Sequence, residues 1–193
     1  MLVCTLLLAG CTGLQAPQVE KFHIYTLDAL VSVKTAQLKR DLVLSVSMPR
    51  AKTGFDTFKM AYQRQPHELE YFAVNRWADT PARMLAPLLV QTLEQGFRAV
   101  VQAPGAVSSN IRLDTELIRL QQNFETRPSR VQLTLRAQLI DVTDKRVLAI
   151  KLFDETENAT SEDAYGGVVA ANRALQRVLD QVLEFCINES ASH

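Results

Sequence analysis

Residues 55–86 constrain the fold more than any other stretch, because two strand patterns and the start of a helix follow one another directly. Apolar side chains occupy alternate positions on both sides of a polar turn: Phe58, Met60 and Tyr62 before it, and Leu69, Tyr71 and Ala73 after it. This period of two is typical of a half-buried β-hairpin, and Pro66 marks its turn. We therefore expect an antiparallel hairpin in this part of the chain.

A helix is predicted to begin where the second strand ends. Asp79 or Thr80 can cap it, and Pro81 suits its first turn because the N–H that proline lacks would have no intrahelical partner there. Trp77, the single tryptophan of the chain, lies at the corner between strand and helix. We expect Trp77 to pack in the core, and a platform for a ligand is the alternative.

That helix is expected over residues 80–95. Its apolar residues recur at three- and four-residue steps, which puts them on one face: Leu85, Leu88, Leu89, Thr92 and Leu93. Gly96 is a predicted C-cap. One side of the helix therefore packs on a sheet.

Six further stretches have strand character: residues 22–27, 42–47, 97–101, 116–124, 131–139 and 147–153. Pro49 ends the second of them, and the third is a nearly continuous apolar run, as expected of an interior strand. The fifth alternates strictly between apolar and polar residues, which makes it the clearest strand pattern of the chain. Turn residues follow it, so the last three predict an antiparallel meander.

The last element is a helix expected over residues 161–187. Its apolar stripe consists of Val168, Ala171, Leu175, Val178, Val182 and Phe185. We expect the stripe to be buried against the protein's own sheet, and a helix shared with a partner is the alternative. Cys186 lies on the same apolar face, where an inert buried thiol is expected.

The chain begins with an apolar stretch that ends in Leu8-Ala9-Gly10-Cys11, the form of a bacterial lipobox. Residues 1–10 are then a signal peptide, Cys11 is the lipid attachment site, and residues 11–21 are a lipidated tether. The alternative is a buried N-terminal strand with two ordinary cysteines. The stretch is shorter than the roughly 20 residues of a membrane-spanning helix. No basic residue precedes it, so we expect the native start to lie upstream of Met1, or the chain to have been trimmed.

Composition excludes several classes of function. Lysine plus arginine equals aspartate plus glutamate at 21 each, so no overall field attracts nucleic acid. The three histidines have no spacing that fixes a metal ion, and no phosphate-binding loop or nucleophile elbow is present, so no cofactor is expected. Without a linker-like run, residues 22–187 read as one domain, followed by a tail over 188–193.

The order of these features resembles a known family. Its pattern runs through Tyr25-x-Leu27, Val46-x-x-Pro49, Met60-x-Tyr62, Leu69-x-Tyr71, Trp77, Pro81 and Leu85-x-x-Leu88. This arrangement is similar to the ABC-type transport auxiliary lipoproteins, the PqiC-like family associated with MCE lipid transporters of Gram-negative bacteria, over residues 22–186. The resemblance agrees with the fold expected from the patterns, a single α/β domain with a mixed, largely antiparallel sheet and two main helices packed against it. Its family-motif positions, expected to be structural, are Tyr25, Leu27, Pro49, Tyr62, Tyr71, Trp77 and Pro81.

The resemblance also implies a function. We expect a non-enzymatic, periplasm-facing lipoprotein that assists an ABC transporter and docks an MCE-type periplasmic protein to move lipids or other hydrophobic molecules. Position 12 is Thr and not the Asp of inner-membrane retention, which favours the outer membrane. The strands over 116–124 and 131–139 are expected to offer an edge or a face for docking, and a homo-oligomer remains possible.

Two other classes of function stay open from the sequence. One is a lipoprotein for envelope assembly or integrity that is not tied to an ABC transporter. The other is a surface hydrolase, which would need His23 or His67 beside a serine or carboxylate in a deep polar pocket.

Overall fold

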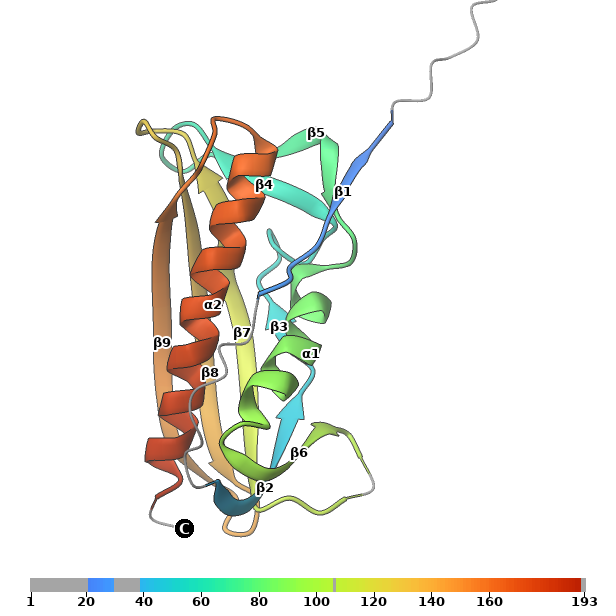
Figure 1. Ribbon diagram of the computed structural model, residues 1–193, viewed down its shortest axis with the longest axis vertical. Helices are drawn as coiled ribbons and strands as arrows, with labels where there is room; N and C mark the ends of the chain where they lie inside the picture. The colour runs from blue at the N-terminus through green and yellow to red at the C-terminus, as the bar shows by residue number, and fades with distance from the viewer. Residues whose placement is uncertain (1–20, 30–38, 106, 192–193) are drawn as a thin grey trace, which may run out of the picture.

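The computed structural model describes residues 21–29, 39–105 and 107–191 (Figure 1). Within them the chain is one α/β domain with a single mixed sheet and two helices packed on it, so the predicted fold class is confirmed. The strands are β1 (His23–Tyr25), β2 (Arg40–Ser47), β3 (Arg50–Ala51), β4 (Lys59–Gln63), β5 (Glu70–Trp77), β6 (Phe97–Ala103), β7 (Ile111–Asn123), β8 (Arg130–Asp141) and β9 (Arg146–Asn158). The helices are α1 (Pro81–Leu93) and α2 (Ala164–Glu189).

The sheet is arranged around β7. β8 pairs with β7 antiparallel over nearly its whole length, while β2, β3 and β4 follow one another along the other edge of β7, all parallel to it. β6 pairs with β2, and β5 pairs with β4 and carries β1. Among the described strands five pairings are parallel and three antiparallel, but the longest ladders, β7–β8 and β8–β9, are antiparallel.

The predicted meander is present as β7, β8 and β9. Leu133, Leu135 and Leu139 on β8 are buried, as the strict alternation predicts, and α2 packs across β8 and β9 (Figure 1). β9 continues to Asn158, whereas the sequence pattern predicted an end at residue 153. The polar residues of the extension stay in the strand because they interact with α2, as described below.

The predicted hairpin is formed by β4 and β5, but the prediction of which residues of β5 face the core was wrong. Phe72 packs against the core, with its ring centroid 4.7 Å from that of Tyr62. Tyr71, expected on the apolar face, instead donates its hydroxyl to the backbone oxygen of Gly54 at 3.0 Å. A register shift between Lys59 and Ala61 on β4 accompanies this arrangement. Such irregularities are not visible in an alternation pattern.

α1 begins at Pro81, with Thr80 at the N-cap position. The side chain of Thr80 makes no capping hydrogen bond, so the helix start depends on Pro81 and on packing. The predicted apolar face is confirmed in its central residues, since Leu85, Leu89 and Leu93 are all buried.

Gly96 does not act as the predicted C-cap. Glu94 holds the C-cap position of α1, and none of the described glycines has a positive φ. A Cβ atom on Gly96 would lie 2.8 Å from a terminal methyl carbon of Leu183 and 2.8 Å from one of Ile187. A larger residue would require the side-chain ends of Leu183 and Ile187 to shift.

β6 was predicted as an interior strand, and the structure makes it an edge strand. Among the described strands it pairs only with β2. Phe97 is completely buried and Val100 packs against the core, next to α1. Burial by a helix, and not by strands on both sides, accounts for the apolar run.

α2 confirms the predicted stripe, whose residues from Val168 to Phe185 are all buried in the domain's own core. Asp163 caps the helix, because its side chain accepts a hydrogen bond from the backbone N–H of Gly166 at 2.8 Å. The helix runs to Glu189, two residues into the predicted tail. Cys186 is buried, and burial raises the pKa of its thiol.

The predicted anchor lies outside the described residues. This applies to Cys11, to the signal peptide over 1–10 and to the tether over 11–21 except for its last residue. In the described part of the chain, neither helix has both the length and the apolar character that crossing a bilayer requires.

Candidate docking surface

β9 is the longest edge of the sheet. In the described part of the chain it pairs only with β8, so one side of its 13 residues has no neighbouring strand. The other described strands with a single neighbour are shorter, because β1 has three residues, β3 two and β6 seven. An unpaired edge presents backbone N–H and C=O groups to any strand that approaches.

Exposed aliphatic side chains lie along this edge. Val147, Ile150 and Leu152 have exposed fractions of 48%, 52% and 56%. Phe153 points toward α2, where its ring packs against Phe185, so Ile150 and Leu152 face the opposite side of the sheet. Their neighbours on β8 are polar there, Gln138 and Arg136. The face of the sheet that points away from α2 is therefore polar here, with an apolar margin along β9.

The inner side of β9 is tied to α2 by ion pairs. Arg177 lies 2.8 Å from the carboxylate of Glu155 and 2.9 Å from that of Glu157. Arg173 lies 3.6 Å from Glu157, and Gln181 donates to Glu155 at 2.6 Å. The hydrogen bond to Glu155 raises the pKa of Arg177. These contacts fix the second half of β9, so its free edge is held in an extended form.

Such an edge is suited to strand addition. A partner strand that pairs with β9 would gain backbone hydrogen bonds, and apolar side chains beside Ile150 and Leu152 would add specificity. Lys151 is exposed on the inner side of the same edge, with its ammonium 5.2 Å from the ring centroid of Phe153. A lysine at a sheet edge limits indiscriminate pairing. The surface therefore favours a specific strand over general aggregation.

The predicted docking strands are not edges. The patterns over 116–124 and 131–139 became β7 and β8, and both have neighbours on each side. Only their outer face remains available. The signal for β9 was present in the sequence, since residues 147–153 are apolar at most positions and do not alternate, which indicates apolar side chains on both faces.

Three of the family-motif residues lie on the sheet around the hairpin. Tyr62 is buried, and its hydroxyl donates to Glu70 at 2.8 Å; this hydrogen bond, with burial, raises the pKa of the phenol. Tyr25 donates its hydroxyl to Asn75 at 3.3 Å. As noted above, Tyr71 bonds to the backbone of the loop before β4. All three link segments of the β1–β5–β4 corner.

The other motif residues are spread over the domain. Leu27 and Trp77 belong to the core, with exposed fractions of 7% and 6%, and Pro49 is buried between β2 and β3. Pro81 starts α1. None of the motif residues belongs to β9, so they do not form the docking surface.

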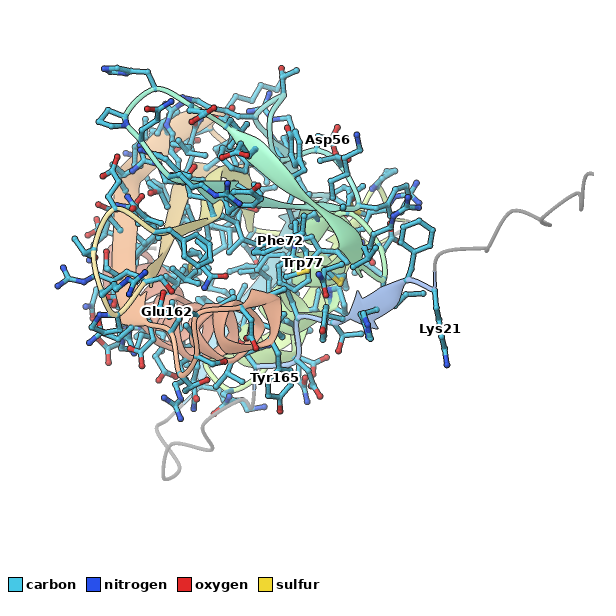
Figure 2. The ribbon with its side chains drawn as sticks, turned by 90° about the horizontal axis from the view of Figure 1, so that it is seen from above. Lys21, Asp56, Phe72, Trp77, Glu162 and Tyr165 are labelled. Atoms are coloured by element: carbon cyan, nitrogen blue, oxygen red, sulfur yellow. The ribbon has the colours of Figure 1, made fainter. Side chains whose placement is uncertain are left out.

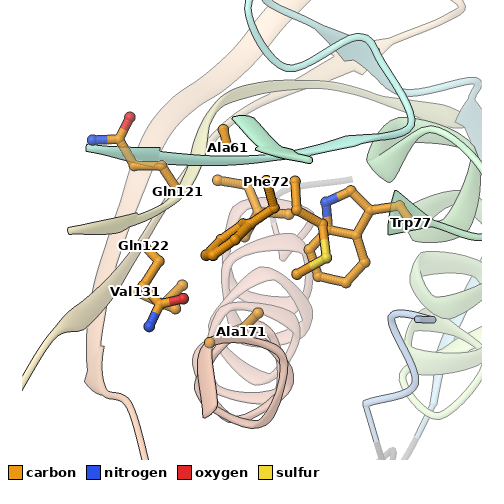
Figure 3. A pocket seen from close by; sticks show the side chains of 10 residues that line it. Ala61, Phe72, Trp77, Gln121, Gln122, Val131 and Ala171 are labelled. Atoms are coloured by element: carbon orange, nitrogen blue, oxygen red, sulfur yellow. The ribbon is translucent and has the colours of Figure 1, made fainter. Parts of the chain in front are cut away.

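A small cavity lies beside Trp77 (Figure 3). Figure 3 shows Phe72, Trp77, Gln122 and Ala171 around it, contributed by β5, β7 and α2. Gln122 donates to Ser129 at 2.9 Å, while its side-chain oxygen has no hydrogen-bond partner among the described residues. The space open to the centre of a water molecule is about 20 Å³, enough for one water and far too small for an acyl chain.

His67 lines an open, polar hollow together with Glu68 and Glu125, the kind of setting that a surface hydrolase would need. His23 and His67 are exposed, one on β1 and the other in the β4–β5 turn. In the part of the chain that the structure describes, neither forms a hydrogen bond with a serine or carboxylate, and no cluster of histidine, cysteine and carboxylate side chains fits a metal ion.

The sequence assigns the domain to a class of transport proteins. It matches the model for the ABC-type transport auxiliary lipoprotein component over residues 25–183, and the chain therefore belongs to that family. The suspected resemblance is confirmed. No curated protein matches the chain.

Solved structures share the fold. A protein from Xanthomonas campestris is 21% identical with a TM-score of 0.81, and the match covers 88% of this chain and 98% of that one. An uncharacterized protein is 13% identical with a TM-score of 0.69, covering 86% and 99%. A hypothetical protein from Chlamydia trachomatis is 7% identical with a TM-score of 0.58, covering 80% and 100%. At these identities the likeness is one of fold.

Proposed function

We propose that this protein is a non-enzymatic, periplasm-facing lipoprotein of the outer membrane that serves as the auxiliary subunit of an ABC transporter. Its partner is an MCE-type periplasmic protein, and the cargo is a lipid or another hydrophobic molecule. The family match over residues 25–183 carries the proposal.

The β9 edge is the surface that we assign to the partner. Its length, its row of Val147, Ile150 and Leu152, and its fixation by α2 favour the addition of a partner strand. A strand that is already extended loses less conformational entropy on binding than a flexible one. The domain thus holds a transporter component in place and has no turnover of its own.

Cys11 is the attachment point in this proposal. The Leu-Ala-Gly-Cys run requires cleavage before Cys11 and acylation of its thiol. In the complete precursor, Cys11→Ser should abolish palmitate labelling and release the protein from the membrane fraction. Cys4→Ser is the matched control, because residue 4 leaves with the signal peptide, and it should change neither result. Labelling that survives in Cys11→Ser would disprove the anchor.

The docking assignment is tested by photo-crosslinking in cells. A crosslinking amino acid at Ile150 should capture an MCE-type protein, whereas the same group at Met48, which is 48% exposed at another site, should not. Leu152→Lys should remove the capture without loss of stability, since the side chain is 56% exposed. Met48→Lys is the matched control.

Three results would contradict the proposal. Capture from Met48 but not from Ile150 would move the interface away from β9. Capture of an envelope-assembly component would favour the alternative function, and hydrolysis of a lipid or glycan by the purified domain, with no transporter component captured, would favour an enzyme.

A further inference from the structure

A second exposed surface lies at the opposite side of the sheet, where β1 pairs with β5. Ile24 on β1 is in register with Arg76 on β5, and Arg76 is in register with Lys59 on β4. The guanidinium of Arg76 stands 3.5 Å from the ring centroid of Phe22. Phe22, Ile24, Arg76 and Lys59 thus form one surface, which together with Lys21 we call the β1 patch.

The β1 patch combines apolar and cationic side chains. Ile24 is 67% exposed and Phe22 is 38% exposed, while Lys21, Lys59 and Arg76 are all exposed. Among the described residues no carboxylate lies within ion-pair distance of Lys59 or Arg76. Their cationic groups instead lie over aromatic rings, with the ammonium of Lys59 5.4 Å from the ring centroid of Tyr71. Positive charge is therefore available at this surface.

The patch is fixed to the domain. Asn172 on α2 accepts a hydrogen bond from the backbone N–H of Asp28 at 2.6 Å and donates to the backbone oxygen of Thr26 at 3.3 Å. With the β1–β5 pairing, these bonds hold the chain that follows the patch. Lys21 lies beside β1 and points away from the body of the domain (Figure 2).

The patch is also the first described surface after the predicted anchor. Lys21 follows Cys11 by ten residues, a distance of about 35 Å at full extension and about 17 Å on average for a flexible chain. A membrane that holds Cys11 therefore stays within reach of the patch, which raises its effective concentration at the lipid surface. Aromatic and aliphatic side chains enter the headgroup boundary, and lysine and arginine are attracted by anionic lipids.

We propose that the β1 patch rests on the anionic lipid surface in which Cys11 is anchored. The proposal rests on the proposed function, because it takes the anchor from it. β1 and β9 are opposite edges of the sheet, so contact at β1 leaves the β9 edge free for the transporter partner (Figure 1). The membrane contact thereby sets the orientation in which the docking edge is presented.

Vesicle binding tests the patch without the anchor. The mature chain from residue 11, with Cys11→Ser, should bind vesicles that contain phosphatidylglycerol more tightly than phosphatidylcholine vesicles. Lys59→Gln with Arg76→Gln should lower the partition coefficient by about tenfold or more. Lys145→Gln with Lys151→Gln removes the same charge near β9 and should change it less than about twofold. Equal losses in the two pairs, or no loss in the first, would overturn the proposal.

Depth quenching tests the patch in the anchored protein. In a Trp77→Phe background, Ile24→Trp should be quenched by brominated phosphatidylglycerol and Ile150→Trp should not. An unquenched Ile24→Trp in acylated protein would disprove the membrane contact and leave the anchor intact. If mass spectrometry finds no acyl chains on the native protein, the anchor is disproved, and the vesicle assay still tests the patch.

Discussion

Replacing Trp77 by alanine should destabilise the domain strongly. The side chain of Trp77 is only 6% exposed, and it closes the corner between β5 and α1. A tryptophan side chain that buries about 200 Å² at about 25 cal/mol per Å² contributes about 5 kcal/mol. Truncations of this size cost about 3–5 kcal/mol, and the space left by the indole would join the small cavity already beside Trp77.

The assay is urea unfolding followed by far-UV circular dichroism, because the variant lacks the single tryptophan of the chain. In a thermal scan of the same signal, the expected loss lowers Tm by about 6–20 °C for a domain of this size. Trp77→Phe is the control and should lose about 1–2 kcal/mol, since the ring keeps most of the volume. An alanine variant with an unchanged free energy of unfolding would refute the packing argument, and one that also lost partner capture would make Trp77 a binding residue.

Two further substitutions test local contacts. Gly96→Ala should lower the free energy of unfolding in calorimetry by no more than about 1 kcal/mol, because the new methyl group meets only side-chain ends of Leu183 and Ile187, and Ile187→Val should recover part of the loss; a larger loss would show that these side chains cannot move aside. Asp163→Ala should lose about 1 kcal/mol through the missing cap. The hydrogen bond from Gly166 lowers the pKa of Asp163, so this contribution is present above its ordinary value of 3.8 and is lost as pH falls through the lowered pKa. Urea unfolding at neutral and acidic pH should therefore show the difference between wild type and Asp163→Ala shrinking in acid, and a constant difference would exclude the ionised cap.

The local sequence patterns predicted the helices and strands better than they predicted which strands pair with one another. Alternation in residues 131–139 and the stripe from Val168 to Phe185 are set by burial on one face, which the sequence records directly. The pairing of β2, β3 and β4 with the same edge of β7 joins residues far apart in the chain. No local period encodes such pairing, and the parallel ladders were missed for that reason.

The candidate surface was missed for a related reason. Glu155 and Glu157 look like loop residues in the sequence, but they are strand residues because Arg177 compensates both charges from α2. Because the sequence pattern ended this strand at residue 153, it predicted a short edge and placed the long strands at β7 and β8. Contacts between distant elements thus accompany the long free edge of β9, and no local pattern records them.

The shortness of β1 has a mechanical consequence. In the proposed arrangement, with an anchor at Cys11 and a partner at β9, any tension between them crosses the sheet, and β1 is paired with β5 over only three residues. We expect β1 to detach first, together with the hydrogen bonds from Asn172, and to add about 25 Å of chain from residues 22–28 to the tether. The meander and α2 would stay folded. The domain would therefore lengthen its tether under tension, and the β1 patch would be intact only while that tension is absent.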